Sequence, residues 1–133
     1  MPSIWAAFSL TEGLDLPEPG ARRFTVDVDP GDTFIWPFYW CASDEDTLAE
    51  NLRFLTVHFF VDDFPVAPAA ILQFDQASSD WDCRLWTTMI SGWQAGTEVS
   101  LTIRYSFSQD VDDGIREYPA GDYSFELEAD VGG

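Results

Sequence analysis

The side chains best suited to nucleophilic or acid–base chemistry are few in this sequence. It holds one histidine, His58, and no lysine, so all six of its basic residues are arginines. His58 lies in the apolar run 54–61, and a catalytic role would need a nucleophile and an orienting acid that converge on it. A structural histidine within a strand is the favoured interpretation. Without lysine, Schiff-base chemistry and a P-loop lysine are excluded.

Carboxylates are the abundant functional groups, with 24 Asp and Glu and a formal net charge of −18. Residues 110–114 gather three acids and a glycine, but their spacing does not match a calcium-binding EF-hand. Asp27, Asp29 and Asp32 flank a turn, and residues 62–63 form a third cluster. Solvated turn aspartates are the favoured interpretation of all three clusters. A pair of carboxylates at the spacing that a glycosidase needs would say little about function, because almost any arrangement of so many acids offers one.

Metal and cofactor sites find little support in the remaining residue types. One histidine and two cysteines cannot fill a tetrahedral zinc site without carboxylates. The sequence shows no nucleophile elbow and no glycine-rich phosphate loop. We therefore expect no enzymatic activity, no metal and no cofactor.

Cys41 and Cys83 are the two cysteines of the chain. A disulfide between them would constrain the unfolded chain by about 4 kcal/mol in the entropy model. The compartment decides the outcome, because a secreted protein would form the bridge and a cytosolic protein would keep two buried thiols. Each cysteine borders a predicted strand beside an irregular acidic segment, so we expect the disulfide.

The aromatic run 34–41 is a candidate binding surface. Alternation puts its even positions, which include Trp36 and Trp40, on one face and Cys41 on the other. If Cys41 faces the interior, the aromatic stripe faces outward, and the same parity on the second cysteine strand turns Trp86 outward. Such a platform would stack sugar rings or bind a protein, so these three tryptophans are the candidate ligand-binding residues. The simpler interpretation is that the stripe is the core face or is covered by a helix.

The elements that must position these residues are strands. Apolar and polar residues alternate through most of the chain, which is typical of half-buried antiparallel strands. Turn residues rich in Gly, Pro and Asp separate the runs. The predicted strands cover residues 3–9, 23–29, 32–40, 53–62, 83–90, 98–107, 115–118 and 122–130, with a weaker run at 70–74.

One short helix is predicted after the aromatic run. Ser43 can cap residues 44–51, with Asp46 at the third position and Leu48 and Leu52 on one side. A length of 133 residues suits a single domain that spans the whole chain. Many short strands separated by turns predict an all-β sandwich or barrel.

Residues 118–127 carry a family resemblance. The order Tyr-Pro-Ala-Gly-Asp-Tyr, followed by alternating residues, resembles the closing strand of bacterial immunoglobulin-like sandwich domains. The resemblance implies that Tyr123 acts as a corner tyrosine whose hydroxyl caps a backbone group. It implies an antiparallel immunoglobulin-like β-sandwich of about seven to nine strands. The spacing departs from the antibody pattern, since Trp86 follows Cys83.

Charge and composition limit the partners. A charge of −18 disfavours direct nucleic-acid binding and anionic membranes. No apolar run is long enough to span a membrane, and the residues after Met1 show no secretory signal. Aromatic residues make up 16% of the chain, which is unlike a disordered acidic tail.

Function is expected at the level of a class. Immunoglobulin-like domains in bacteria usually serve surface proteins, so we expect a non-catalytic binding or structural module that is extracellular or on the cell surface. Its partner would be a glycan or a protein, or it would contribute to an assembly. The alternative is an acidic intracellular inhibitor that mimics nucleic acid, motivated by the charge and the start at Met1.

Overall fold

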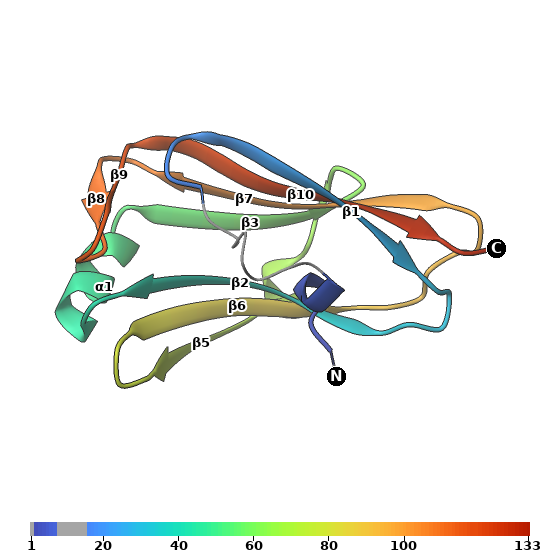
Figure 1. The fold of residues 1–133 in the computed structure, drawn as a ribbon, viewed down its shortest axis with the longest axis horizontal. Coiled ribbons are helices and arrows are strands. Elements are labelled where there is room, and N and C mark those ends of the chain that lie inside the picture. Colours follow the sequence, from blue (N-terminus) through green and yellow to red (C-terminus); the bar gives the residue numbers. More distant parts are fainter. Residues whose placement is uncertain (1, 8–15) are drawn as a thin grey trace.

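The structure is a computed structural model that describes residues 2–7 and 16–133, and most of these residues lie in strands (Figure 1). The prediction of an all-β chain with one short α-helix is confirmed. In chain order the elements are η1 (Ile4–Ala7), β1 (Gly20–Val28), β2 (Phe34–Ala42), α1 (Glu45–Leu52), β3 (Leu55–Val61), β4 (Phe64–Pro65), η2 (Pro68–Ala70), β5 (Leu72–Ala77), β6 (Asp82–Ile90), β7 (Glu98–Phe107), β8 (Val111–Asp112), β9 (Glu117–Tyr118) and β10 (Gly121–Val131).

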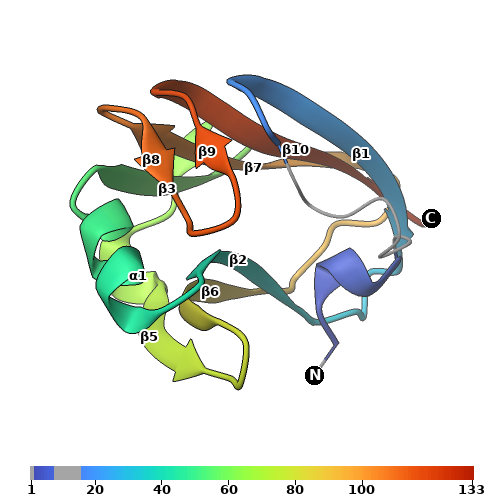
Figure 2. The same ribbon diagram turned by 60° about the vertical axis from the view of Figure 1, so that its left-hand side comes forward.

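The strands form two main sheets. One has five strands in the order β1-β10-β7-β3-β4, the other has three in the order β2-β6-β5, and β8 and β9 form a small ribbon. All pairs are antiparallel except β1 with β10, which run parallel. Figures 1 and 2 show the two main sheets facing each other as two layers, with α1 and the β8–β9 ribbon at one end.

Aromatic side chains fill the space between the sheets. Alternation along β2 points one row of rings toward the five-stranded sheet. Three ring pairs join the sheets, with centroid separations of 4.9, 4.6 and 4.9 Å: Trp36 with Phe59, Phe38 with Tyr105, and Trp40 with Phe107. Edge-on and tilted packing of this kind adds to the stabilisation from apolar burial. The core therefore lies between the even positions of β2 and the inward positions of β3, β7 and β10.

The helix α1 closes one end of this core. Its N-cap is Asp44, whose carboxylate accepts a hydrogen bond of 2.7 Å from the Thr47 backbone. That bond, and others to the first turn, hold the pKa of Asp44 below its usual value. The predicted helix is confirmed, whereas the predicted cap at Ser43 is wrong by one residue. The backbone of Asp44 is extended, as at an N-cap, and its carboxylate accepts from the first-turn amide.

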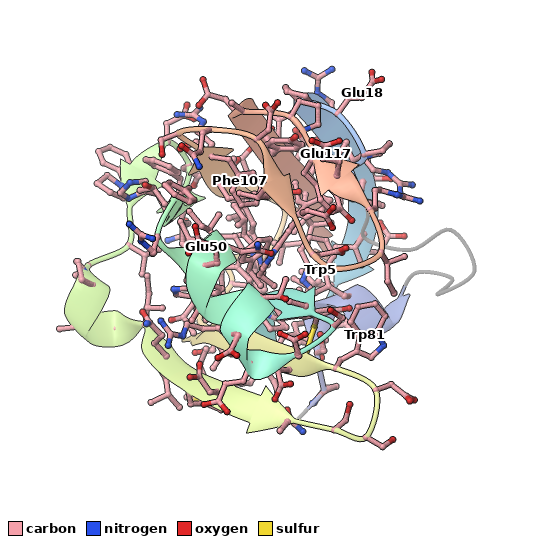
Figure 3. All side chains as sticks on the ribbon, turned by 90° about the vertical axis from the view of Figure 1, so that its left-hand side faces the viewer. Trp5, Glu18, Glu50, Trp81, Phe107 and Glu117 are labelled. Carbon is pink, nitrogen blue, oxygen red and sulfur yellow. A yellow bond between two sulfur atoms is a disulfide. The ribbon has the colours of Figure 1, made fainter. Side chains whose placement is uncertain are left out.

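Asn51 ties the helix to β2 and to the β8–β9 ribbon. Its buried amide accepts a bond of 3.0 Å from Trp40 Nε1 and donates one of 2.9 Å to the Asp112 carbonyl. Figure 3 faces this end of the molecule and shows α1 across the opening between the sheets. One side chain thus joins β2, α1 and β8, which satisfies polar groups that would otherwise be costly to bury.

The N-terminal segment differs from the prediction of a strand over 3–9. Residues 4–7 form a 3₁₀ helix, Ser3 makes a single parallel bridge to Ile35, and residues 8–9 lie outside the described residues. Trp5 is buried and donates a bond of 2.8 Å from Nε1 to the Pro37 carbonyl. The segment therefore seals the edge of β2 with a side chain instead of extending the sheet.

Two weaker predictions are also adjusted. The predicted strand over 115–118 is confined to the two residues of β9, and β5 extends to Ala77, beyond the weak run at 70–74. Asp113 explains the first change, because its carboxylate accepts backbone bonds from Ile115 and Arg116 and holds that stretch as a turn.

Tyr123 makes the hydrogen bond expected of a corner tyrosine. Its hydroxyl donates to the Pro119 carbonyl at 2.6 Å, and its ring stacks on Tyr105 with centroids 5.1 Å apart. Burial, with added repulsion from Asp110 and Glu18, raises the pKa of Tyr123, so the hydroxyl stays protonated and able to donate. The predicted hydrogen bond from the Tyr123 hydroxyl to a backbone group is therefore confirmed.

Removing this hydroxyl tests the corner. We expect Tyr123→Phe to lower the free energy of unfolding by about 1–2 kcal/mol, because it leaves a partly buried carbonyl without its donor. Urea denaturation followed by tryptophan fluorescence measures the change. Tyr39→Phe is the matched control, because Tyr39 is 50% exposed and should change stability little. Equal effects of the two substitutions would show that the corner bond does not stabilise the fold.

Candidate functional site

The outward side of the three-stranded sheet is apolar. Residues of β2, β6 and β5 that alternate with the core positions point away from the five-stranded sheet. We call these eleven positions the apolar outer face: Ile35, Pro37, Tyr39, Cys41, Leu72, Phe74, Gln76, Cys83, Leu85, Thr87 and Met89. None of these residues carries a charge, although the chain holds 24 acids.

Strand register brings these side chains into rows. Leu85 stands between Tyr39 on β2 and Phe74 on β5, and Thr87 stands between Pro37 and Leu72. Directly opposed side chains in a sheet are close enough to form one surface. Exposure is high along the rows: Tyr39 is 50% exposed, Phe74 41%, and Leu72 and Met89 63% each.

The five-stranded sheet presents the opposite character to solvent. Its outward positions on β1, β7 and β10 are mostly charged or hydroxyl side chains. Arg23 pairs with Glu126 at 2.8 Å, and the Ser100 hydroxyl donates to Glu128 at 2.9 Å. The chain therefore builds one ordinary solvated sheet face and one apolar sheet face, and the apolar one calls for an explanation.

The disulfide lies within the apolar outer face. Cys41 and Cys83 are opposed residues of β2 and β6 and are joined, with Cα atoms 4.0 Å apart. Figure 3 shows the sulfur–sulfur bond near Trp81. The predicted disulfide is confirmed, but Cys41 does not face the interior. The bridge links neighbouring strands of one sheet and fixes their register in that face.

The predicted outward tryptophan platform is wrong, because all three of its side chains lie on the inward side of the three-stranded sheet. Trp36 is 0% exposed and Trp40 is 7% exposed, because the even positions of β2 form the core face. Trp86 is partly buried and packs on Phe38 at 5.5 Å, on the same inward side. The simpler interpretation of the aromatic run, as the core face, is confirmed, and it turns the odd positions outward.

The edge of β5 borders the apolar outer face. All six residues of β5 are exposed, and the strand has a neighbour only on its β6 side among the described strands. On the opposite face of β5, Asp75 accepts two bonds of 2.6 and 3.1 Å from Arg84. The guanidinium holds the pKa of Asp75 below its usual value, so this carboxylate is charged at neutral pH.

The other candidate groups do not come together in a common site. His58 is exposed on β3 opposite Arg104, with Phe60 beside it at 6.4 Å. Asp110 accepts a bond from the Ala120 backbone and Asp112 accepts one from Gly114, each at 2.8 Å. These turn carboxylates thus cap backbone amides. Among residues 2–7 and 16–133, no cluster of three or more potential metal ligands is present.

A cavity of about 530 Å³ lies between α1 and the segment that carries β8. Asp46, Glu50, Asp110 and Asp112 contribute to its lining. Its buried polar side chain, Asn51, is already bonded on both sides as described above. The groove is lined by like-charged acids and holds no buried polar side chain left unpaired among the described residues, so we favour the apolar outer face as the candidate site.

Sequence reasoning missed the exposed apolar residues on β5 and β6. Leu72 and Phe74 fall in a short alternating run, whereas Met89 belongs to a run whose apolar residues fall on both sides of the strand. That pattern resembles a strand buried on both faces, so it gives no sign that one face is open. The usable signal is the uncharged odd row of β2, which stands out in so acidic a chain.

Comparisons with known proteins give little further information. No protein-family model matches the sequence, and no curated protein is detectably similar to it. The chain is similar to a chain in the solved structure of PbICP-C in complex with falcipain-2, with 11% identity and a TM-score of 0.45. The alignment covers 90% of this chain and 95% of that chain. Within the described residues, no helix has the length and apolar character needed to cross a bilayer.

Proposed function

We propose that this chain is a non-catalytic, immunoglobulin-like binding domain of an exported protein, and that it binds a protein partner through the apolar outer face. The observation that carries the proposal is the contrast between the two sheets. Eleven adjacent outward positions on one sheet lack charge in a chain with a net charge of −18, whereas the other sheet exposes Arg, Glu, Ser and Thr.

The composition of the face favours a protein partner. Tyr39, Phe74 and Met89 are of the residue types that are enriched in protein interfaces, and charged residues are depleted from interface centres. A large contiguous apolar patch that is exposed on a protein surface usually marks an interaction site. A glycan platform loses its support, because Trp36 and Trp40 lie in the core.

Charge argues against a second copy of the chain as the partner. Two molecules that each carry −18 repel each other at close range, and the repulsion is strongest at low salt. A neutral or basic partner would instead be attracted by the same field, which speeds association. The proposed partner is therefore a different protein with a neutral or basic contact surface.

The order of the strands supports the immunoglobulin-like part of the proposal. Counted along the chain, β2, β5 and β6 stand as strands B, D and E in one sheet, and β3, β7 and β10 as C, F and G in the other, which is the immunoglobulin arrangement. Two features depart from the antibody pattern. The disulfide lies within the B–E pair, and the corner tyrosine, Tyr123, opens the last strand.

Export is supported by the disulfide, because oxidising compartments are where such bridges form and persist. The non-catalytic part is supported by the fate of the candidate reactive groups. His58 stands beside Arg104 and Phe60, and turn carboxylates such as Asp113 accept backbone N–H bonds.

Site-specific photo-crosslinking tests the proposal. A benzoylphenylalanine at position 72 or 89, on the apolar outer face, should give protein adducts in the medium of cells that produce the chain. The matched controls are positions 64 and 115, where Phe64 and Ile115 are 75% and 71% exposed but lie outside the face. Adducts at 72 and 89 and none at 64 and 115 are expected. Equal adducts at all four positions, or none at the face, would contradict the proposal.

A further inference from the structure

The edge of β5 is open to a further strand. Its backbone bonds pair it with β6, and among the described residues no other backbone hydrogen bond reaches residues 72–77. Such an edge presents a row of free N–H and C=O groups. The strand is six residues long, which is the usual length of a strand that another segment can extend.

The remaining sheet edges are less open. The β2 edge carries the N-terminal segment, since Ile35 N donates to the Pro2 carbonyl at 2.9 Å and Trp5 donates to Pro37. The β4 edge has only two residues. The β1 edge turns Arg23 and Asp27 outward, and charged side chains commonly protect an edge from pairing. Among the edges of the two main sheets in the described residues, β5 is the one that joins an open backbone of several residues to exposed apolar side chains.

Alternation along β5 sets the side chains that an added strand would need. On one side Leu72 and Phe74 continue the apolar outer face, and on the other Gln73 and Asp75 are exposed. An added strand would therefore place apolar residues beside Leu72 and Phe74. Its alternate residues would face Asp75, whose carboxylate binds Arg84 but whose side chain is still 57% exposed and has acceptor sites left for a second donor. A cation suits that position, and an acid does not.

From these observations we propose that the partner contributes an extended segment, alternately apolar and cationic, that adds as a strand to the free edge of β5. This inference rests on the proposed function and specifies how the partner is recognised. Backbone hydrogen bonds to β5 supply the pairing, as in other cases of strand addition. Charge supplies selectivity, because the β5 strand of a second copy has no basic residue to offer and the second chain also carries −18.

A defined peptide tests the inference. The probe is an acetylated, amidated heptapeptide that alternates valine with arginine, labelled with fluorescein and titrated with the disulfide-bonded protein by anisotropy. In an extended strand the valine N–H groups point to one edge and the arginine N–H groups to the other. N-methylation of one set should abolish binding, and N-methylation of the other set should leave it within about threefold. A glutamate version of the peptide should not bind.

Two substitutions complete the test. Asp75→Asn should weaken binding of the arginine peptide about tenfold, whereas Asp122→Asn, an exposed acid on the other sheet, should not. Absence of binding by the parent peptide at millimolar protein, or equal loss with either set of N-methyl groups, would overturn strand addition. The proposed function fails separately, when crosslinking shows no preference for positions 72 and 89. If crosslinking is specific for positions 72 and 89 but both sets of N-methyl groups have equal effects, the partner binds the apolar outer face without adding a strand to β5.

Discussion

Trp36→Ala is expected to lower the free energy of unfolding by about 3–5 kcal/mol, as large-to-small substitutions of buried aromatic residues do. Trp36 is 0% exposed, and its ring meets Phe59 of the other sheet at 4.9 Å. The truncation would open a cavity between the sheets near the start of β2. Urea denaturation followed by far-UV circular dichroism measures the change.

Two control variants separate the core from the apolar outer face. Tyr39→Ala alters the same strand three residues on, where the side chain is 50% exposed, and should cost far less. Trp36→Phe should retain most of the stability, because Trp36 Nε1 has no hydrogen-bond acceptor among the described residues. A larger loss for Tyr39→Ala than for Trp36→Ala would contradict the assignment of the two faces of β2.

Replacing both cysteines by alanine should cost about 4 kcal/mol in the chain-entropy model. The bridge joins residues separated by 42 positions and holds β2 and β6 in register at one end of the face. Without it the unfolded chain gains freedom while the folded sheets keep their aromatic core. Urea denaturation of the Cys41→Ala/Cys83→Ala variant and of the oxidised protein, each fitted with its own m-value, measures the loss.

Reduction of the unmodified protein provides the control for the cysteine variant. The reduced protein should unfold at about the same urea concentration as the double variant, since both lack the cross-link. A midpoint unchanged by either treatment would show that the disulfide is not a stabilising element. Strong destabilisation of the variant alone would assign the effect to the packing of alanine instead of to the bridge.

Much of the fold follows from alternation. β7 and β10 keep apolar residues at every second position and polar residues between them, and both were predicted within a residue or two. Such strands have one face on the core and one in solvent, so their pattern determines their orientation. The cysteine pair was predicted because both residues border strands, and Tyr123 was predicted from the turn before it.

The orientation of β2 could not be predicted in the same way. Residues 34–42 are apolar on both faces, so alternation divides them into two rows without saying which row is buried. The choice depends on the five-stranded sheet, where Phe59 and Tyr105 accept the large rings of the even row. The candidate site moved to the odd row for this reason, and Trp36 and Trp40 became core residues.

The identity of β5 as an open edge also lies beyond local pattern. Leu72 and Phe74 show a short alternation, but whether a neighbouring strand covers them depends on sheet order. The N-terminal 3₁₀ helix is a similar case, because Trp5 donates a hydrogen bond to the carbonyl of Pro37, which is distant in the sequence. Long-range pairing decides both, and a single sequence does not encode it in any local signal.

The most direct test of the account is a competition experiment on the photo-crosslink at position 72. Purified unlabelled protein is added in excess, either unchanged, as Tyr39→Ser/Phe74→Ser, or as the control Phe64→Ser/Ile115→Ser. Each pair removes two exposed apolar side chains, but only the first pair lies in the apolar outer face. The account predicts that the unchanged protein and the control abolish the adduct, and that the face variant needs at least about tenfold more protein to do so. Equal competition by all three proteins would show that the apolar outer face does not bind the partner.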